Sequence, residues 1–137
     1  MKFTTVLGAL LVLSANHALA GDPAPTPAPS LVQEVTNREN ERLLADSNGN
    51  TLYVFDLDKG KPAPACNGDC AEVWPPYLLS VDEAKTLVAP LGLIQRANRK
   101  AQLTYEGRPV YNYAFDRVRG DDKGDGVGGL WHYIELK

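Results

Sequence analysis

A short pattern that occurs twice constrains the fold of this chain more than any other feature. In each copy a tyrosine is followed two positions later by a second aromatic residue, and three positions after that by an aspartate. The copies are Tyr53-Val54-Phe55-Asp56-Leu57-Asp58 and, 58 residues further on, Tyr111-Asn112-Tyr113-Ala114-Phe115-Asp116. Residues two apart in a strand share one face, so each copy presents its two aromatic side chains together. Coincidence among hairpins is the alternative to a true repeat.

Each aspartate of the pattern falls just past the end of its strand. There its carboxylate is expected to accept hydrogen bonds from turn amides or from a tyrosine hydroxyl. We therefore expect an architectural role for the six motif residues, which are Tyr53, Phe55, Asp58, Tyr111, Tyr113 and Asp116. The rival hypothesis makes Asp58 and Asp116 an acid/base pair.

Most of the chain reads as short strands between glycine-rich or polar turns. Residues 42–46 and 51–55 flank Asn48-Gly49, a strong hairpin signal because both residues tolerate positive φ. Residues 91–95 and 101–105 flank a polar turn at 96–100, and further strands are expected at 109–113 and 130–136. Residues 31–40 are ambiguous between strand and helix.

Two short helices are expected. One spans about 70–74, with Asp69 and Glu72 resembling a cap and Pro75-Pro76 ending it. The other covers 81–87, where Ser80 and Glu83 can form a capping box. The predicted fold class is mainly β, a small antiparallel β domain built on two pseudo-repeated hairpins with one or two short helices.

The N-terminal residues predict export. Lys2, an apolar run from Val6 to Leu13 and Ala18-Leu19-Ala20 form a signal peptide over residues 1–20, with cleavage before Gly21. The apolar run is too short for a transmembrane helix, and no second one follows. Proline alternates with small residues over 22–30, so residues 21–30 are expected to be an extended Pro/Ala-rich linker. A single β-rich domain should then occupy residues 31–137.

Charge and histidine content argue against two large functional classes. The chain carries 17 acidic and 14 basic residues, a balance that disfavours nucleic-acid binding. After cleavage only His132 remains of the two histidines, and no G-x-S-x-G nucleophile turn is present. We therefore expect a non-catalytic protein with no cofactor.

The two cysteines, Cys66 and Cys70, enter an oxidising compartment on export. Their spacing allows a disulfide, which is the expected state. A redox-active pair is the second hypothesis, although the Cys-x-x-Cys spacing is absent. A zinc site with His132 is the third, and it lacks a fourth protein ligand.

The order of these segments resembles a bacterial family. Cys66-x-x-x-Cys70 leads to Trp74-Pro75-Pro76, and Gly120-Asp121-x-x-Gly124-x-Gly126 leads to Trp131-His132. With the two Tyr-x-aromatic-x-x-Asp copies, residues 42–137 resemble the secreted-repeat family of predicted lipoproteins. The resemblance implies an exported envelope protein without an established activity. Many relatives look like lipoproteins, but this chain has Gly21 where they have a cysteine, so acylation is not expected.

Three further groups of residues are candidates for binding. A weak calcium site could use Asp116, Asp121 and Asp125, although a solvated glycine-rich loop is the favoured interpretation. Six basic residues between 96 and 119 could form a face for an anionic polymer or lipid headgroups, against an ordinary hairpin surface. Trp74, Trp131 and His132 are the remaining candidates, and for His132 packing with one hydrogen bond is expected.

The sequence thus predicts an exported, periplasmic or secreted, non-catalytic module that binds a partner or helps to maintain the envelope. We expect a monomer with no transmembrane segment, and the protein or envelope partner is left open. A redox or electron-transfer accessory and a periplasmic enzyme inhibitor are the alternatives.

Overall fold

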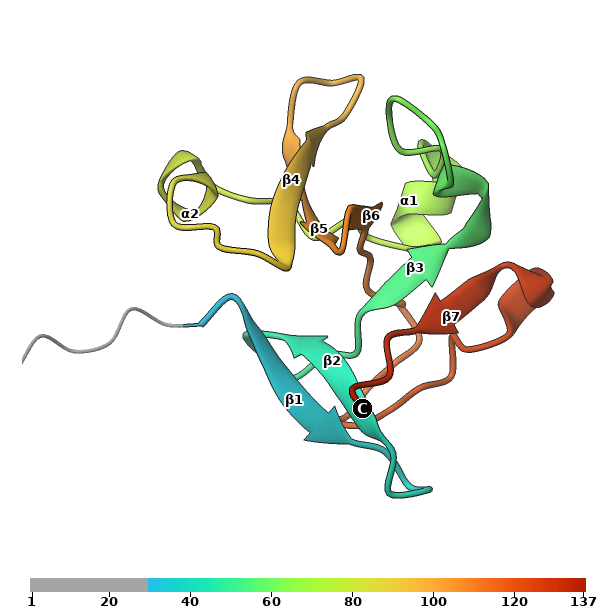
Figure 1. The fold of residues 1–137 in the computed structure, drawn as a ribbon. Coiled ribbons are helices and arrows are strands. Elements are labelled where there is room, and N and C mark those ends of the chain that lie inside the picture. Colours follow the sequence, from blue (N-terminus) through green and yellow to red (C-terminus); the bar gives the residue numbers. More distant parts are fainter. Residues whose placement is uncertain (1–29) are drawn as a thin grey trace, which may run out of the picture.

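The strands of the protein are short and antiparallel, and they are joined by long turns (Figure 1). The computed structural model describes residues 30–137; the expected signal peptide and nearly all of the expected linker lie outside the described residues. The strands are β1 (Val32–Thr36), β2 (Arg42–Asp46), β3 (Tyr53–Phe55), β4 (Leu91–Gln95), β5 (Ala101–Tyr105), β6 (Arg108–Pro109) and β7 (Trp131–Tyr133). The helices are α1 (Asp69–Val73) and α2 (Val81–Ala84), with 3-10 turns at Asp56–Asp58 and Val127–Gly129. The predicted mainly-β class is confirmed.

Two hairpins of the same form begin the two halves of the domain. β1 pairs with β2 in register Val32↔Asp46, so the ambiguous segment 31–40 is a strand over 32–36 and a turn after it. β4 pairs with β5 in register Leu91↔Tyr105, as the sequence predicts. β6 then adds to the other edge of β5 and forms a three-stranded sheet.

The expected hairpin around Asn48-Gly49 is shorter than predicted. Gly49 takes a φ of 90°, and the Asp46 carboxylate holds the turn by accepting hydrogen bonds from the amides of Asn48 (2.9 Å) and Asn50 (3.0 Å). Pairing with β2 reaches only Leu52, whose amide donates to the Leu44 carbonyl at 2.9 Å. β3 then turns away to pair with β7, because its aromatic side chains pack against Trp131 from that strand.

Two other predicted strands are also shorter than expected. Of residues 109–113, only Pro109 belongs to β6, and Tyr111 makes isolated bridges to Tyr53 and Pro76. The last strand is confined to β7, with one further bridge between Glu135 and Leu43. In both places the chain leaves one partner strand for another, so no single ladder grows long.

The end of each half crosses to the other half. Ile134 accepts a main-chain hydrogen bond from Leu44 and donates one to Leu52, at 2.9 and 3.3 Å. Tyr77, at the end of the first half, accepts from Leu103 at 2.8 Å and donates to Val110 at 3.1 Å, both in the second half. Figure 1 shows the result at the centre of the domain, where β3 and β7 run side by side although they are far apart in the sequence. Each half is therefore completed by the other.

β3 separates two apolar clusters. Tyr53 and Phe55 point into an aromatic cluster, whereas Leu52 and Val54 point into an aliphatic cluster with Leu44, Leu103 and Val110. All four consecutive residues 52–55 are buried, which is the signature of a strand covered on both faces.

The helices follow the sequence in position but not in every cap. α1 starts after Gly68, whose φ is 56°, and no side chain caps it, so the expected cap of Asp69 and Glu72 is wrong. α2 has the predicted capping box of Ser80 and Glu83. The helix ends at Ala84 and not at 87. Just beyond this end, the Thr86 hydroxyl donates a hydrogen bond to the Glu83 carbonyl at 2.9 Å. No helix among residues 30–137 is long and apolar enough to cross a membrane.

Candidate functional site

The two motif copies are joined by hydrogen bonds that run from each copy to the other. The Tyr53 hydroxyl donates to Asp116 Oδ2 at 2.6 Å, and the Tyr111 hydroxyl donates to Asp58 Oδ2 at 2.8 Å. The sequence predicts tyrosine hydroxyls or turn amides as partners of these carboxylates, but it does not indicate that each aspartate takes the tyrosine of the opposite copy.

Both carboxylates also accept a main-chain amide on their second oxygen. Ala65 donates to Asp58 Oδ1 at 2.7 Å, and Lys123 donates to Asp116 Oδ1 at 3.1 Å. The two aspartates are thereby held in place from both sides. No hydrogen bond joins Asp58 to Asp116, because the oxygens of each carboxylate are taken by the opposite tyrosine and by a main-chain amide.

The environment keeps both phenols protonated. Burial, followed by the hydrogen bond to Asp116, raises the pKa of Tyr53 far above its usual value. Burial, followed by the charge of Asp58, does the same to the pKa of Tyr111. Burial also raises the pKa of the Asp116 carboxyl. At neutral pH both tyrosines therefore serve as hydrogen-bond donors and not as phenolates.

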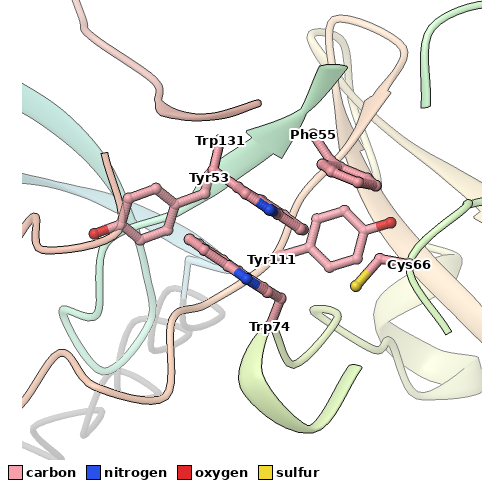
Figure 2. Close-up of a cluster of buried hydrophobic side chains, with 6 residues drawn as sticks. All are labelled: Tyr53, Phe55, Cys66, Trp74, Tyr111 and Trp131. Atoms are coloured by element: carbon pink, nitrogen blue, oxygen red, sulfur yellow. The ribbon is translucent and has the colours of Figure 1, made fainter. Parts of the chain in front are cut away.

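Four aromatic rings stack into a column between the two pairs. Phe55 stacks on Trp131 at 4.2 Å, Trp131 on Trp74 at 3.8 Å, and Trp74 on Tyr113 at 4.2 Å between ring centroids. Figure 2 shows the two indoles lying face to face, with Tyr53 and Tyr111 approaching from opposite sides. Tyr111 meets Trp131 edge-on at 5.1 Å, and such edge and stacked contacts add to the stabilisation that burial provides.

Gly124 closes the column against the acidic loop. A Cβ at this position would lie 2.8 Å from Trp74 and 2.9 Å from Tyr53. Its amide donates to the Tyr53 hydroxyl at 3.2 Å, so a chain of hydrogen bonds runs from Gly124 through Tyr53 to Asp116. The rings of Trp74 and Tyr53 leave no room for a side chain at position 124, which explains the glycine there although its φ is not positive.

The expected disulfide joins Cys66 and Cys70, whose Cα atoms lie 5.3 Å apart. Cys66 is 1% exposed and packs against the aromatic cluster, so the bond fastens the loop before α1 to the core. The hypothesis of a zinc site is wrong, because both sulfurs are committed to this bond.

Arg96 reaches the disulfide loop from the β4–β5 turn. Its guanidinium donates to the Gln102 side chain at 2.7 Å, to the Cys66 carbonyl at 2.7 Å and to the Asn67 side chain at 2.9 Å. Only 5% of the residue is exposed. The sequence did not indicate that Arg96 holds the disulfide loop. The prediction of one basic face over 96–119 is wrong for this residue, because it is buried. Nothing in the local sequence distinguishes it from its exposed neighbour Arg99.

The acidic loop does not gather its carboxylates. Asp121 accepts from the amides of Arg117 (2.7 Å) and Val118 (3.1 Å) and lies 3.1 Å from Lys123 Nζ. Asp125 instead accepts the Tyr133 amide at 3.2 Å. Asp116, Asp121 and Asp125 therefore have separate partners, and no three His, Cys, Asp or Glu side chains of residues 30–137 are placed to hold a metal ion.

Asp121 is a structural residue of this loop. The favoured picture of a solvated loop is wrong for it, because only 6% of the residue is exposed. Its hydrogen bond from the Arg117 amide is the largest cause that lowers the pKa of this carboxyl to about 2. The charged carboxylate therefore fastens the turn at neutral pH.

His132 lies on the rim of the fold beside Asp56. Its Nε2 is 3.0 Å from Asp56 Oδ2, while Arg108 approaches the other oxygen at 3.4 Å. The contact with His132 is the main cause that lowers the pKa of Asp56. The sequence anticipated one hydrogen bond for this histidine but did not identify Asp56 as its partner.

Comparison with known proteins relates this geometry to a repeat. The family model for a secreted repeat of unknown function matches residues 34–77 and again 92–135, together more than half of the chain. The chain belongs to this secreted-repeat family. The two matched segments begin 58 residues apart, which is the offset of the two motif copies. Membership confirms the resemblance drawn from the sequence and fits an exported protein.

Each matched secreted repeat contains most of a hairpin, one motif copy and the end segment that crosses to the other half. The crossed tyrosine–aspartate pairs are thus contacts between two repeats. Searches of curated proteins and of solved structures return no match to the chain.

A groove lies apart from the motif, between α2 and the β4–β5 turn. Its volume is about 680 Å³. Apolar side chains form its floor, contributed by Leu78, Leu79, Val81, Ala84 and Ala101. Three basic residues, Lys85, Arg99 and Lys100, also line it. Sequence reasoning did not identify this groove, because its walls come from two separate segments, 78–85 and 99–101.

Proposed function

We propose that the protein is an exported, non-catalytic envelope module that works as a monomer and binds a small apolar or amphiphilic molecule in the groove beside α2. The observation that carries the proposal is this exposed, apolar-floored groove, in which Val81 is 75% exposed and Leu78 is 38% exposed. Its volume falls within the ~300–1,000 Å³ typical of small-molecule sites.

The contacts of the repeat motif support binding in the groove and an architectural role for the motif itself. The four tyrosine and aspartate side chains at its core are bonded to one another and to main-chain amides. Side chains engaged in this way stabilise the fold and leave ligand contacts to the surface. We place binding in the groove and an architectural role in the motif.

Native mass spectrometry of the protein purified from the periplasm tests this proposal. We expect a bound molecule that is recovered chemically unchanged and that is lost in Val81→Asp. Val118→Asp is the matched control, because Val118 is also exposed, at 61%, but lies outside the groove. An adduct that both variants retain, conversion of the bound molecule, or no adduct at all would each contradict the proposal.

The ring column favours a second candidate, a redox accessory. The stacked rings Phe55, Trp131, Trp74 and Tyr113 continue to Phe115, which is 54% exposed and meets Tyr113 at 5.3 Å. Flash photolysis with a photogenerated one-electron oxidant tests it. A tyrosyl or tryptophanyl radical whose yield depends on Trp74 would support electron transfer through the column, and a yield unchanged in Trp74→Phe would exclude that route.

A further inference from the structure

We propose that the occupant of the groove is a fatty acid whose carboxylate lies on the basic rim and whose alkyl chain lies on the apolar floor. This inference rests on the proposed function, since it assigns a ligand class to the same groove. It follows from the shape, the rigidity and the charge of the walls.

The apolar floor is open to solvent, with Val81 75% and Leu78 38% exposed. Leu78, Val81 and Ala84 come from the segment around α2, and Ala101 comes from the start of β5. The two alanines leave room between the larger side chains. Exposed apolar surface of this kind is costly in water, and covering it with an alkyl chain is favourable at about 25 cal/mol per Å².

Both walls of the groove are fixed by hydrogen bonds. The capping box of Ser80 and Glu83 sets the start of α2, with contacts of 2.7 and 3.2 Å. The Leu79 amide donates to the Ala101 carbonyl at 2.9 Å, which ties this segment to β5. A preformed groove loses little conformational entropy when a ligand enters.

The charge of the groove is opposite to that of the chain. The chain has a net charge of −3, whereas the groove is lined by Lys85, Arg99 and Lys100. Lys85 is paired with exposed Asp82 at 3.1 Å, but Arg99 and Lys100 take part in none of the ion pairs found among residues 30–137. Two unpaired cations beside an apolar floor suit a single anionic head, and a guanidinium can bind a carboxylate through two parallel hydrogen bonds.

Titration calorimetry with twelve-carbon amphiphiles below their micellar concentrations tests the inference on the full secreted chain. We expect dodecanoate to bind and dodecyltrimethylammonium, which has the same chain and the opposite charge, to bind at least about tenfold more weakly. The double variant Arg99→Glu/Lys100→Glu should weaken dodecanoate about tenfold and reverse the preference. Val81→Asp should weaken both amphiphiles.

Arg38→Glu is the matched control, since Arg38 is exposed and lies away from the groove. Methyl NMR shifts of Leu78 report the site in every variant, and the shifts of the buried Leu52 and Leu103 methyls show that each variant is folded. Equal affinity for both amphiphiles, or a dodecanoate affinity unchanged by the charge reversal, would overturn the fatty-acid assignment and leave the binding function standing. If dodecanoate fails to bind while native mass spectrometry shows a different ligand, the fatty-acid assignment is likewise overturned and the binding function still stands.

Discussion

Tyr53 and Tyr111 exchange two main-chain hydrogen bonds, with N···O distances of 2.8 Å from Tyr53 to Tyr111 and 2.9 Å in the reverse direction. Each tyrosine is the first residue of its motif copy, so the main chains of the two copies are paired where the copies begin. From there the tyrosine side chains pass to Asp116 and Asp58 of the opposite copies. The motif therefore acts as a reciprocal clasp between the two secreted repeats.

A double-mutant cycle should measure this clasp. Tyr53→Phe and Asp116→Asn should each lower the free energy of unfolding by ~1–3 kcal/mol, because the first removes a donor to half-buried Asp116 and the second replaces one of its two acceptor oxygens with a donor group. Combined, they should cost less than the sum of the two changes, since one hydrogen bond is lost in both. Chemical denaturation of the four proteins gives the coupling energy.

The control cycle pairs Tyr53→Phe with Asp58→Asn, which belong to the same copy but do not contact each other. These two changes should be additive within about 0.5 kcal/mol. Coupling within a copy but not between copies would mean that the crossed hydrogen bonds are absent in solution.

Neither repeat should fold alone. A protease site introduced into segment 86–89, where every residue except half-buried Leu87 is exposed, would separate the two matched repeats. After cleavage we expect the fragments to remain associated in gel filtration, because Ile134 and Tyr77 complete the strands of the opposite halves. The separated fragments should show no near-ultraviolet circular dichroism. A fragment that folded by itself would show that the crossing is dispensable.

Gly124→Ala should disturb the ring column. The added methyl would lie within 3 Å of Trp74 and Tyr53, and overpacking of this kind costs roughly 1–3 kcal/mol. Stacked Trp74 and Trp131 should give an exciton signal in circular dichroism, and this signal should change in the variant. Gly60→Ala is the control, because a Cβ at this position meets nothing within 4 Å. The positive φ of Gly60 makes this change destabilising too, but the exciton signal should stay unchanged.

Arg96→Lys should destabilise the protein although the charge is kept. An ammonium cannot reproduce the forked contacts to Gln102, Asn67 and the Cys66 carbonyl, so one or two buried groups lose a partner, at ~1–3 kcal/mol. Arg99→Lys, at an exposed position in the same turn, should change the melting temperature little. Equal melting temperatures for the two variants would show that the buried contacts contribute nothing.

Asp121 should contribute to acid stability with a defined sign. Its pKa is lowered from 3.8 to about 2 on folding, so its stabilisation is complete above about pH 4 and is lost as the pH falls through 2. The melting temperature of the parent should therefore exceed that of Asp121→Asn at pH 5, and the gap should close towards pH 2. Asp116, whose pKa is raised, acts in the opposite direction and is present in both proteins. A gap independent of pH would contradict the assignment.

The sequence by itself determined the local features. The unbroken apolar run from Leu52 to Phe55 is typical of a strand covered on both faces, and all four residues are buried. A spacing of four residues predicted the Cys66–Cys70 disulfide, and Ser80 with Glu83 predicted the capping box of α2. Each of these depends on residues within a few positions of one another, whose geometry the backbone of a turn, a strand or a helix already fixes.

Only the tertiary structure decided the partners across the repeats. Tyr53 and Asp116 are 63 positions apart, and Tyr111 and Asp58 are 53 apart. Because the copies are alike, the sequence allows each tyrosine to meet the aspartate of its own copy or of the other. The exchanged main-chain bonds of Tyr53 and Tyr111 fix the crossed arrangement, and the same long-range packing buries Arg96 while its neighbour Arg99 stays exposed. Such choices depend on which surfaces are buried together, and that is a property of the folded chain as a whole.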